Sequence, residues 1–167
     1  MPDDIDPIVP LSDADARLLA EVLELNRRNV VALSELDACK LKTLINNSFQ
    51  AIAFRSANAF LLAFDQHAAY DSPNFRWFQD RFSRFVYIDR VVVADHARGR
   101  GLARALYREL FNEARQRGHS LLTCEINVDP PNPPSDRFHN AFGFEEVGTG
   151  RASPQKKVRY LVRRLDN

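Results

Sequence analysis

The N-terminal part of the chain carries apolar residues at helical spacing. Leucine and valine recur every three or four residues from Leu18 to Leu25, which predicts an amphipathic helix that ends near Asn29. A similar pattern predicts a second helix over residues 38–46. The segment Ser12-Asp13-Ala14-Asp15 resembles a capping box and predicts the start of the first helix. Residues 5–11 favour a short strand before it.

Two apolar runs follow, and their lengths are typical of strands. Residues 49–54 and 59–64 flank the polar segment 55–58, which predicts a β-hairpin. The next stretch, residues 65–82, is less regular and rich in aromatic side chains. Within it, Asp71-Ser72-Pro73-Asn74 favours a turn or a helix start.

The pattern is clearest in residues 85–128. A β-branched run over 85–93 predicts a buried strand, a helical stripe over 101–117 predicts a helix, and residues 121–128 predict the next strand. Gly118 is expected to cap the helix in a left-handed conformation. A strand-helix-strand unit of this length predicts parallel strands joined by a right-handed crossover.

The last segment begins with four prolines within residues 129–134. Proline lacks an N–H donor, so we expect the sheet to open there. Ser135 is expected to cap a short helix that runs through Phe142, and residues 144–148 and 157–165 favour two final strands. The order of elements predicts a mixed α/β fold, and the length predicts one domain over residues 1–167.

Composition narrows the function. Hydrophobic residues make up 45% and charged residues 27% of the chain, as in globular proteins, and the net charge of +1 predicts neither nucleic acid nor a membrane as partner. The acidic N-terminus lacks the apolar core of a signal peptide, which favours the cytoplasm. The histidines show no metal-ligand spacing, so no metal site is expected. The oligomeric state is open, and a homodimer is one option.

The most informative segment is residues 91–103, where a strand ends, glycines form a turn and a helix begins. Free backbone N–H groups at the positive end of a helix predict an anion site, most naturally for phosphate. A P-loop is excluded, since its Lys-Ser/Thr pair is missing, and Arg104 stands where a dinucleotide motif needs its third glycine. The segment instead matches R-x-x-G-x-A at Arg98, Gly101 and Ala103. An ordinary glycine-rich turn is the alternative.

This motif resembles the coenzyme A pyrophosphate loop of the GNAT superfamily of N-acetyltransferases. Two more pieces are similar to the family in the right order: Asn132, and the pattern S-x-x-F-x-x-x-x-G-F from Ser135 to Phe144. The element order agrees from about Ile8 to Leu165. The resemblance implies a splayed mixed sheet with helices on both faces. It also implies transfer of an acyl group, usually acetyl, from acetyl-CoA to a primary amine by direct attack in a ternary complex.

The resemblance further implies where coenzyme A binds. Its pantetheine arm would lie along the first strand of the motif as a false extra strand, opposite residues 124–126. A backbone N–H near Val91 or Val92 would then donate to the thioester oxygen. The cofactor contacts implied in this way are Val91, Val92, Val93, Arg98, Gly99, Arg100, Gly101, Leu102, Ala103, Arg104, Asn132, Ser135 and Phe138.

A carboxylate near the cleft would take the proton of the attacking amine. Asp89 is the first candidate, and period-two alternation places it on one face with Tyr87, Val91 and Val93. The alternative for Asp89 is a structural ion pair, with Arg90 or with an arginine of the final strand. Glu125 is the second candidate and has the same ambiguity, and water is a third option.

The leaving thiolate needs a proton. Many family members supply it from a tyrosine four residues before the glycine of the terminal G-F, and this chain has His139 there. An imidazole can donate a proton. Tyr107 or water is an alternative source, and a histidine that only packs on the cofactor is another.

The acceptor site is expected in the segment before the motif, with Trp77, Asp71 and Asn74 as candidate contacts. Aromatic residues at such spacing also fit a core. The acceptor is a small-molecule or peptide amine. A non-catalytic sensor that binds coenzyme A or acyl-CoA is the alternative function, because the usual tyrosine is missing.

Overall fold

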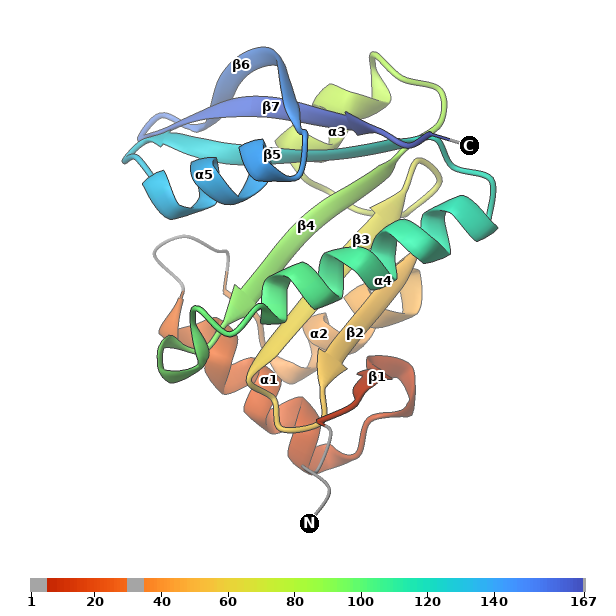
Figure 1. The fold of residues 1–167 in the computed structure, drawn as a ribbon, viewed down its shortest axis with the longest axis vertical. Coiled ribbons are helices and arrows are strands. Elements are labelled where there is room, and N and C mark those ends of the chain that lie inside the picture. The colour runs from red at the N-terminus through yellow and green to blue at the C-terminus, as the bar shows by residue number, and fades with distance from the viewer. Residues whose placement is uncertain (1–5, 30–34, 167) are drawn as a thin grey trace.

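One mixed sheet organises the described part of the chain, which in this computed structural model comprises residues 6–29 and 35–166 (Figure 1). Across the sheet the strands are β1 (Ile8–Pro10), β2 (Gln50–Phe54), β3 (Ala59–Asp65), β4 (Val86–Val93), β5 (Leu121–Asp129), β7 (Lys156–Arg164) and β6 (Glu145–Ser153). Neighbouring strands are antiparallel, except β4 and β5, which are parallel.

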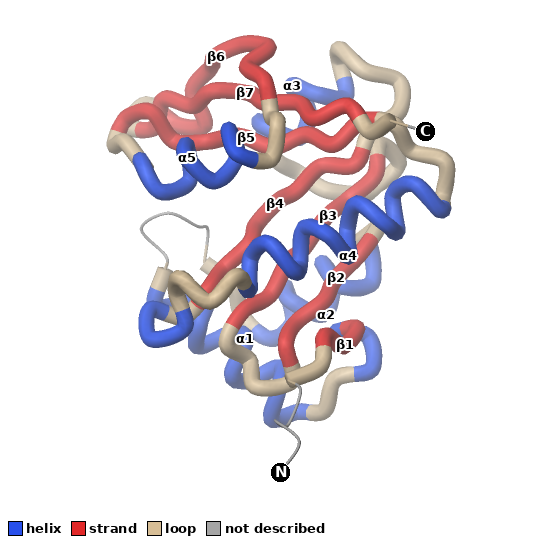
Figure 2. The backbone as a smooth tube through the Cα atoms, in the orientation of Figure 1, coloured by secondary structure: helices blue, strands red, loops and turns tan. Residues whose placement is uncertain are grey.

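Helices cover both faces of this sheet (Figures 1 and 2). They are α1 (Ala16–Arg28), α2 (Ala38–Asn47), α3 (Pro73–Gln79), α4 (Leu102–Gln116) and α5 (Pro133–Ala141), with two short 3₁₀ helices, η1 (Leu11–Asp13) and η2 (Asp95–Ala97). The first three helices pack on one face, and α4 and α5 pack on the other. In the part of the chain that the structure describes, no helix is long and apolar enough to span a membrane.

Strand β3 explains why the sheet has two cores. Phe60, Leu62 and Phe64 belong to the cluster under α1–α3, whereas Leu61 and Ala63 belong to the cluster under α4 and α5. All five side chains are fully buried. A strand covered on both faces is apolar at nearly every position, and the run over residues 59–64 has this pattern.

The main predictions of local structure are confirmed. The hairpin is β2 and β3, and the strand-helix-strand unit is β4, α4 and β5 with parallel strands. Gly118 follows α4 with a φ of +75°, in the left-handed region. The strand predicted over residues 5–11 is limited to β1, and Ile5 lies outside the described residues.

The predicted helix caps are wrong by three residues. Ser12 lies in η1, and the side chain that caps α1 is Asp15, whose Oδ1 accepts the backbone N–H of Leu18 at 2.8 Å. At α5 the cap is Asn132 rather than Ser135: Asn132 accepts the backbone N–H of Ser135, which already lies inside the helix. Strand β6 also extends beyond the predicted residues 144–148, because it forms a long hairpin with β7.

The sheet opens earlier than the prolines suggested. Strand β4 pairs with β5 only at Val86↔Leu122 and Tyr87↔Thr123. Strand β5 keeps its pairing with β7 as far as Asp129↔Lys157, so the prolines that follow it end the strand without opening the sheet. Beyond Tyr87, β4 and β5 diverge, and Figure 1 shows the start of α4 and helix α5 on opposite sides of the gap.

Candidate functional site

A cleft of about 250 Å³ lies where β4 and β5 diverge. Its walls come from β4 and β5, and its ends come from α1, the loop before α4, α4 itself and α5. The residues that line it are Asn29, Ile88, Asp89, Arg90, Val91, Val92, Val93, Arg98, Tyr107, Cys124, Glu125, Ile126, Asn127, Asn132, Ser135 and His139. Segments far apart in the sequence therefore meet in one opening.

A β-bulge in β4 decides which way the side chains of this strand point. Leu62 is paired with Arg90 and Ala63 with Ile88, so Asp89 is the extra residue. The prediction that one face carries Tyr87, Asp89, Val91 and Val93 is therefore wrong. Tyr87 belongs to the core under α1–α3, whereas Val91 packs against the core under α4. The bulge breaks the period of two at Asp89.

The mouth of the cleft is built for an anion. Gly99 and Gly101 have φ values of +75° and +78°, and a Cβ added to either would meet no atom within 4 Å. Gly101 is the N-cap of α4, and it offers no side chain to the first-turn N–H groups. The first turn of α4 therefore presents free donors to open space at the positive end of a helix. Arg98 lines the cleft beside it and pairs with Asp95 at 3.1 Å.

The edge of β4 also fits an extended ligand. Val91, Val92 and Val93 line the cleft, and their registered strand partners all lie on β3. On the β5 side, pairing stops at Tyr87, so the backbone beyond this point has no strand beside it. An unpaired strand edge of this kind offers N–H and C=O groups to an extended ligand.

Asp89 is held by a cation and a phenol. Its Oδ2 accepts Arg90 Nε at 2.6 Å, and its Oδ1 accepts the hydroxyl of Tyr70. The Asp89 and Arg90 side chains are only 6% and 2% exposed. Arg90 Nη1 donates to Asn26 Oδ1 on α1 at 2.8 Å. Both oxygens of Asp89 are thus engaged, and the hydrogen bond from Arg90 to Asn26 joins β4 to α1.

Glu125 has neutral partners instead. The hydroxyl of Tyr87 lies 3.0 and 2.8 Å from its two oxygens, and Asn74 Nδ2 donates to Oε1 at 3.0 Å. Tyr160 donates to Asn74 Oδ1 at 3.0 Å and fixes the amide. Burial raises the pKa of Glu125 to about 8, the nearby charge of Asp89 adds to this rise, and the two hydrogen bonds oppose it. Glu125 therefore exchanges a proton near neutral pH.

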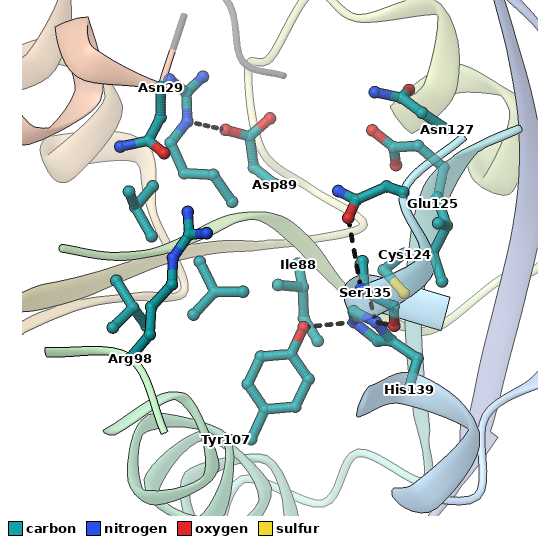
Figure 3. A pocket seen from close by; sticks show the side chains of 16 residues that line it. Asn29, Ile88, Asp89, Arg98, Tyr107, Cys124, Glu125, Asn127, Ser135 and His139 are labelled. Carbon is teal, nitrogen blue, oxygen red and sulfur yellow. Dashed lines mark hydrogen bonds and ion pairs between the residues drawn. The ribbon is translucent and has the colours of Figure 1, made fainter. Parts of the chain in front are cut away.

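A tyrosine and a histidine meet at the end of the cleft that α4 and α5 form. Tyr107 on α4 and His139 on α5 both line the cleft, and the Tyr107 hydroxyl lies 2.7 Å from His139 Nε2. His139 Nδ1 lies 2.8 Å from the carbonyl oxygen of Ser135. Burial lowers the pKa of His139, and burial raises the pKa of Tyr107 well above its usual value. Figure 3 shows the Tyr107 hydroxyl turned toward His139.

The predicted cofactor contacts fall into two groups. Most lie at the cleft or at the start of α4, as described above. Phe138 instead packs edge-on against Tyr107, with ring centroids 4.9 Å apart, and Arg104 lies over the Phe142 ring at 5.4 Å. Asn132 and Ser135 line the cleft and also form the first turn of α5.

The predicted acceptor contacts are dispersed. Trp77 stacks on Tyr160 at 4.1 Å, and Asp71 pairs with Arg76 on the surface, so neither lines the cleft. Asn74 is buried and reaches the site through Glu125. Sequence reasoning missed Tyr70, Tyr87 and Asn26 as site residues. The alternative given for Asp89, a structural ion pair with Arg90, is confirmed.

Comparisons with known proteins agree on one family. A model described as the acetyltransferase (GNAT) family matches residues 43–144. No curated protein gives a significant match to the sequence. The similar solved structures described next are distant in sequence.

Three of these structures illustrate the likeness. A ribosomal-protein-alanine N-acetyltransferase from Brucella melitensis is 22% identical, with a TM-score of 0.69 over 95% of this chain and 99% of that one. A putative acetyltransferase from Salmonella typhimurium, solved with acetyl-CoA, is 18% identical, with a TM-score of 0.69 over 96% and 94%. An aminoglycoside 6'-N-acetyltransferase complexed with coenzyme A is 14% identical, with a TM-score of 0.70 over 95% and 96%. At these identities the structures establish a shared fold, and the family model covers more than half of the chain. The chain belongs to the GNAT family of acetyltransferases.

Proposed function

We propose that this protein transfers an acetyl group from acetyl-CoA to a primary amine, with Glu125 as the group that takes the proton of the amine. The observation that carries the proposal is the opening between β4 and β5. The free N–H groups at the start of α4 lie at its mouth, and Glu125 lies in its wall. One ligand can thus reach from the anion site to a carboxyl group of raised pKa.

The chain has groups suited to each part of the cofactor. The Gly99–Gly101 turn and the first turn of α4 would hold the pyrophosphate, with Arg98 beside it. The unpaired edge of β4 at Val91–Val93 would hold the pantetheine arm by backbone hydrogen bonds. A β4 backbone N–H would donate to the thioester oxygen as charge develops there. Bound acetyl-CoA supplies the acetyl group and a sulfur leaving group.

Glu125 fits the role of general base better than Asp89. A base must be able to gain a proton, and Asp89 already forms a buried ion pair with the cation Arg90, whereas the described partners of Glu125 are neutral. Glu125 is held by Tyr87 and Asn74, and its pKa of about 8 lies close to that of an α-amino group. Glu125 therefore takes the proton directly or through one water, and Asp89 holds β4 in place.

The acceptor is an amine of a peptide or a small molecule. The solved structures with this fold include one named as acting on alanine of a ribosomal protein and one named as acting on an aminoglycoside. For the present chain we propose only the chemical class of the acceptor, a primary amine, and no particular peptide or small molecule. A non-catalytic sensor of coenzyme A is the second candidate, and the histidine at position 139 is the observation that favours it.

The test measures both coenzyme A binding and acetyl transfer. Calorimetry with coenzyme A should detect binding, and release of thiol from acetyl-CoA should appear with a peptide that begins with alanine or with an aminoglycoside. Gly101→Glu should weaken coenzyme A binding by tenfold or more, roughly 1.4 kcal/mol, because it puts a side chain and a negative charge at the anion site. Gln116→Glu, an exposed change at the other end of α4, is the matched control and should bind normally. Absence of coenzyme A binding in the wild type would refute the proposal, and binding without turnover on any amine would favour the sensor.

A further inference from the structure

We propose that Tyr107 gives a proton to the departing sulfur and that His139 positions the Tyr107 hydroxyl for this step. The inference rests on the proposed acetyl transfer. It places the proton donor on α4, whereas the matching position of the family pattern on α5 carries an imidazole. Two residues from two helices would then share the task.

The contacts of His139 exclude it as the direct donor. Its Nδ1 lies 2.8 Å from a backbone carbonyl oxygen, that of Ser135, so Nδ1 must carry a hydrogen and donate it. Its Nε2 lies 2.7 Å from the Tyr107 hydroxyl. A neutral ring with a hydrogen on Nδ1 has a lone pair on Nε2, so Nε2 accepts from Tyr107. Both ring nitrogens are therefore occupied by protein groups.

Burial of His139 supports the same tautomer. The residue is 5% exposed, and burial holds its pKa below the usual value, so the ring is neutral near pH 7. Asp136 is the charged neighbour that opposes this effect, and it does so weakly. A neutral imidazole with its only N–H fixed on a carbonyl has no proton to offer the cleft.

Tyr107 has the right position. Its ring is clamped against Phe138, Phe142 and Phe111 at centroid distances of 4.9, 5.5 and 6.1 Å, so the side chain has little freedom. Its hydroxyl lies in the lining of the cleft, near the level of Ile88 on β4 in Figure 3. The O–H bond can turn from His139 to a sulfur in the cleft without any movement of the ring. The Tyr107 ring is thus held in place, while its hydroxyl hydrogen can still rotate about the C–O bond.

The amine nitrogen forms a bond to the acetyl carbon and loses a proton to Glu125, while the carbon–sulfur bond breaks and the sulfur keeps the electron pair. The sulfur then takes the hydroxyl proton of Tyr107. Water returns a proton to the Tyr107 oxygen, and Glu125 releases its proton to water. The net products are an amide and a free thiol.

Cys124 on β5 and the Ser135 hydroxyl are further protic groups beside Tyr107 and His139. Burial raises the pKa of the Cys124 thiol well above the usual value, with the charge of Glu125 as a smaller cause. Cys124 lines the cleft beside Tyr107 and His139 (Figure 3). The experiment must therefore separate the thiol of bound coenzyme A from that of Cys124.

The main test needs no amine acceptor. The thiol of coenzyme A bound to the protein is titrated by its ultraviolet thiolate absorbance, and the complex with desulfo-coenzyme A is subtracted to remove Cys124 and the tyrosines. A hydrogen bond from Tyr107 favours the thiolate, so the bound thiol should titrate at lower pH in the wild type than in Tyr107→Phe, by about one pH unit. Tyr107→Phe keeps the packed ring, and calorimetry checks that coenzyme A still binds.

Two His139 variants test the positioning role. His139→Gln keeps an oxygen near the place of Nε2 and can still accept from Tyr107, whereas His139→Asn keeps a donor near the place of Nδ1 and loses that acceptor. We expect turnover of acetyl-CoA to fall about tenfold or more in Tyr107→Phe and in His139→Asn at unchanged KM, and to recover largely in His139→Gln. A merely structural histidine would make both variants equal.

The outcomes distinguish the two proposals. If coenzyme A does not bind the wild type, the proposed function fails. If coenzyme A binds and its thiol titrates alike in the wild type and Tyr107→Phe, the role of Tyr107 is refuted while the acetyltransferase proposal stands. If His139→Asn behaves as the wild type, the positioning role of His139 is refuted.

Discussion

Asp89 on β4 and Glu125 on β5 both line the cleft, but their partners are of opposite kind. Asp89 has an arginine and a phenol that occupy both oxygens, within a buried ion pair. Glu125 has a phenol and an amide and lacks a cation partner among the described residues. The same functional group thus serves structure where a cation neutralises it. Where burial disfavours the charged form of the carboxylate, as at Glu125, the group can exchange a proton with a ligand.

The largest expected effect is on catalysis through Glu125. Glu125→Gln keeps the size of the side chain and removes the proton acceptor, so kcat/KM should fall about 100-fold or more, within the range of general-base catalysis. Steady-state thiol release at saturating acetyl-CoA measures it. The matched control is Glu145→Gln on the exposed edge strand β6, which should leave kcat/KM unchanged. A loss below threefold in Glu125→Gln would mean that water alone takes the proton.

The second effect is on stability through Asp89. Asp89→Ala removes the carboxylate from the buried guanidinium of Arg90, and loss of one member of a buried ion pair costs about 3–5 kcal/mol. Urea unfolding at pH 7 measures the loss. Asp71→Ala is the matched control, since Asp71 also pairs with an arginine, Arg76, but on the surface; it should cost under about 1 kcal/mol. Equal losses in the two variants would contradict the structural role of Asp89.

Local signals in the sequence were enough to predict the elements around these carboxylates. The hairpin β2–β3 followed from two apolar runs, and the α4 start followed from the glycines of residues 99–101, whose φ values few other residues adopt. These features depend on residues close in the chain. The parallel pairing of β4 and β5 followed from the length of the crossover.

The environments of the two carboxylates could not be predicted in the same way. An extra residue in β4 reversed the faces at Asp89, and no local pattern marks a bulge that depends on the register with β3. The contacts of Glu125 come from Tyr87 and Asn74, which are 38 and 51 positions away. Sequence analysis could therefore name both carboxylates, but it ranked Asp89 first and Glu125 second, because the contacts that distinguish them lie far apart in the sequence.

A third prediction concerns the pH dependence of stability. The folded pKa of Glu125, about 8, is above its unfolded value, so the folded protein binds more protons between about pH 5 and pH 8. The free energy of unfolding should therefore fall as the pH rises through this window, by roughly 1 kcal/mol per pH unit from this group. The difference between wild type and Glu125→Gln in urea unfolding at several pH values isolates it. If that difference does not change with pH, the pKa of Glu125 is the same in the folded and unfolded protein, and the raised pKa on which its proposed role depends is refuted.

The smallest expected effect is on the pH dependence of kcat/KM when the hydroxyl of Tyr87 or of Tyr70 is removed. Each tyrosine contacts one of the two carboxylates, so the two variants compare these groups directly. The Tyr87 hydroxyl lowers the pKa of Glu125, so Tyr87→Phe should raise that pKa and move the rise of kcat/KM with pH to more alkaline values, by up to about one pH unit. Tyr70→Phe removes the matching hydroxyl from Asp89 and should leave the midpoint unchanged, because Asp89 takes no proton during turnover. Profiles of kcat/KM from pH 6 to pH 9.5 would measure both midpoints. Loss of the phenol that contacts the base should move the midpoint of the pH profile. If Tyr70→Phe shifted this midpoint and Tyr87→Phe did not, Asp89 would be the base and Glu125 would have the structural role.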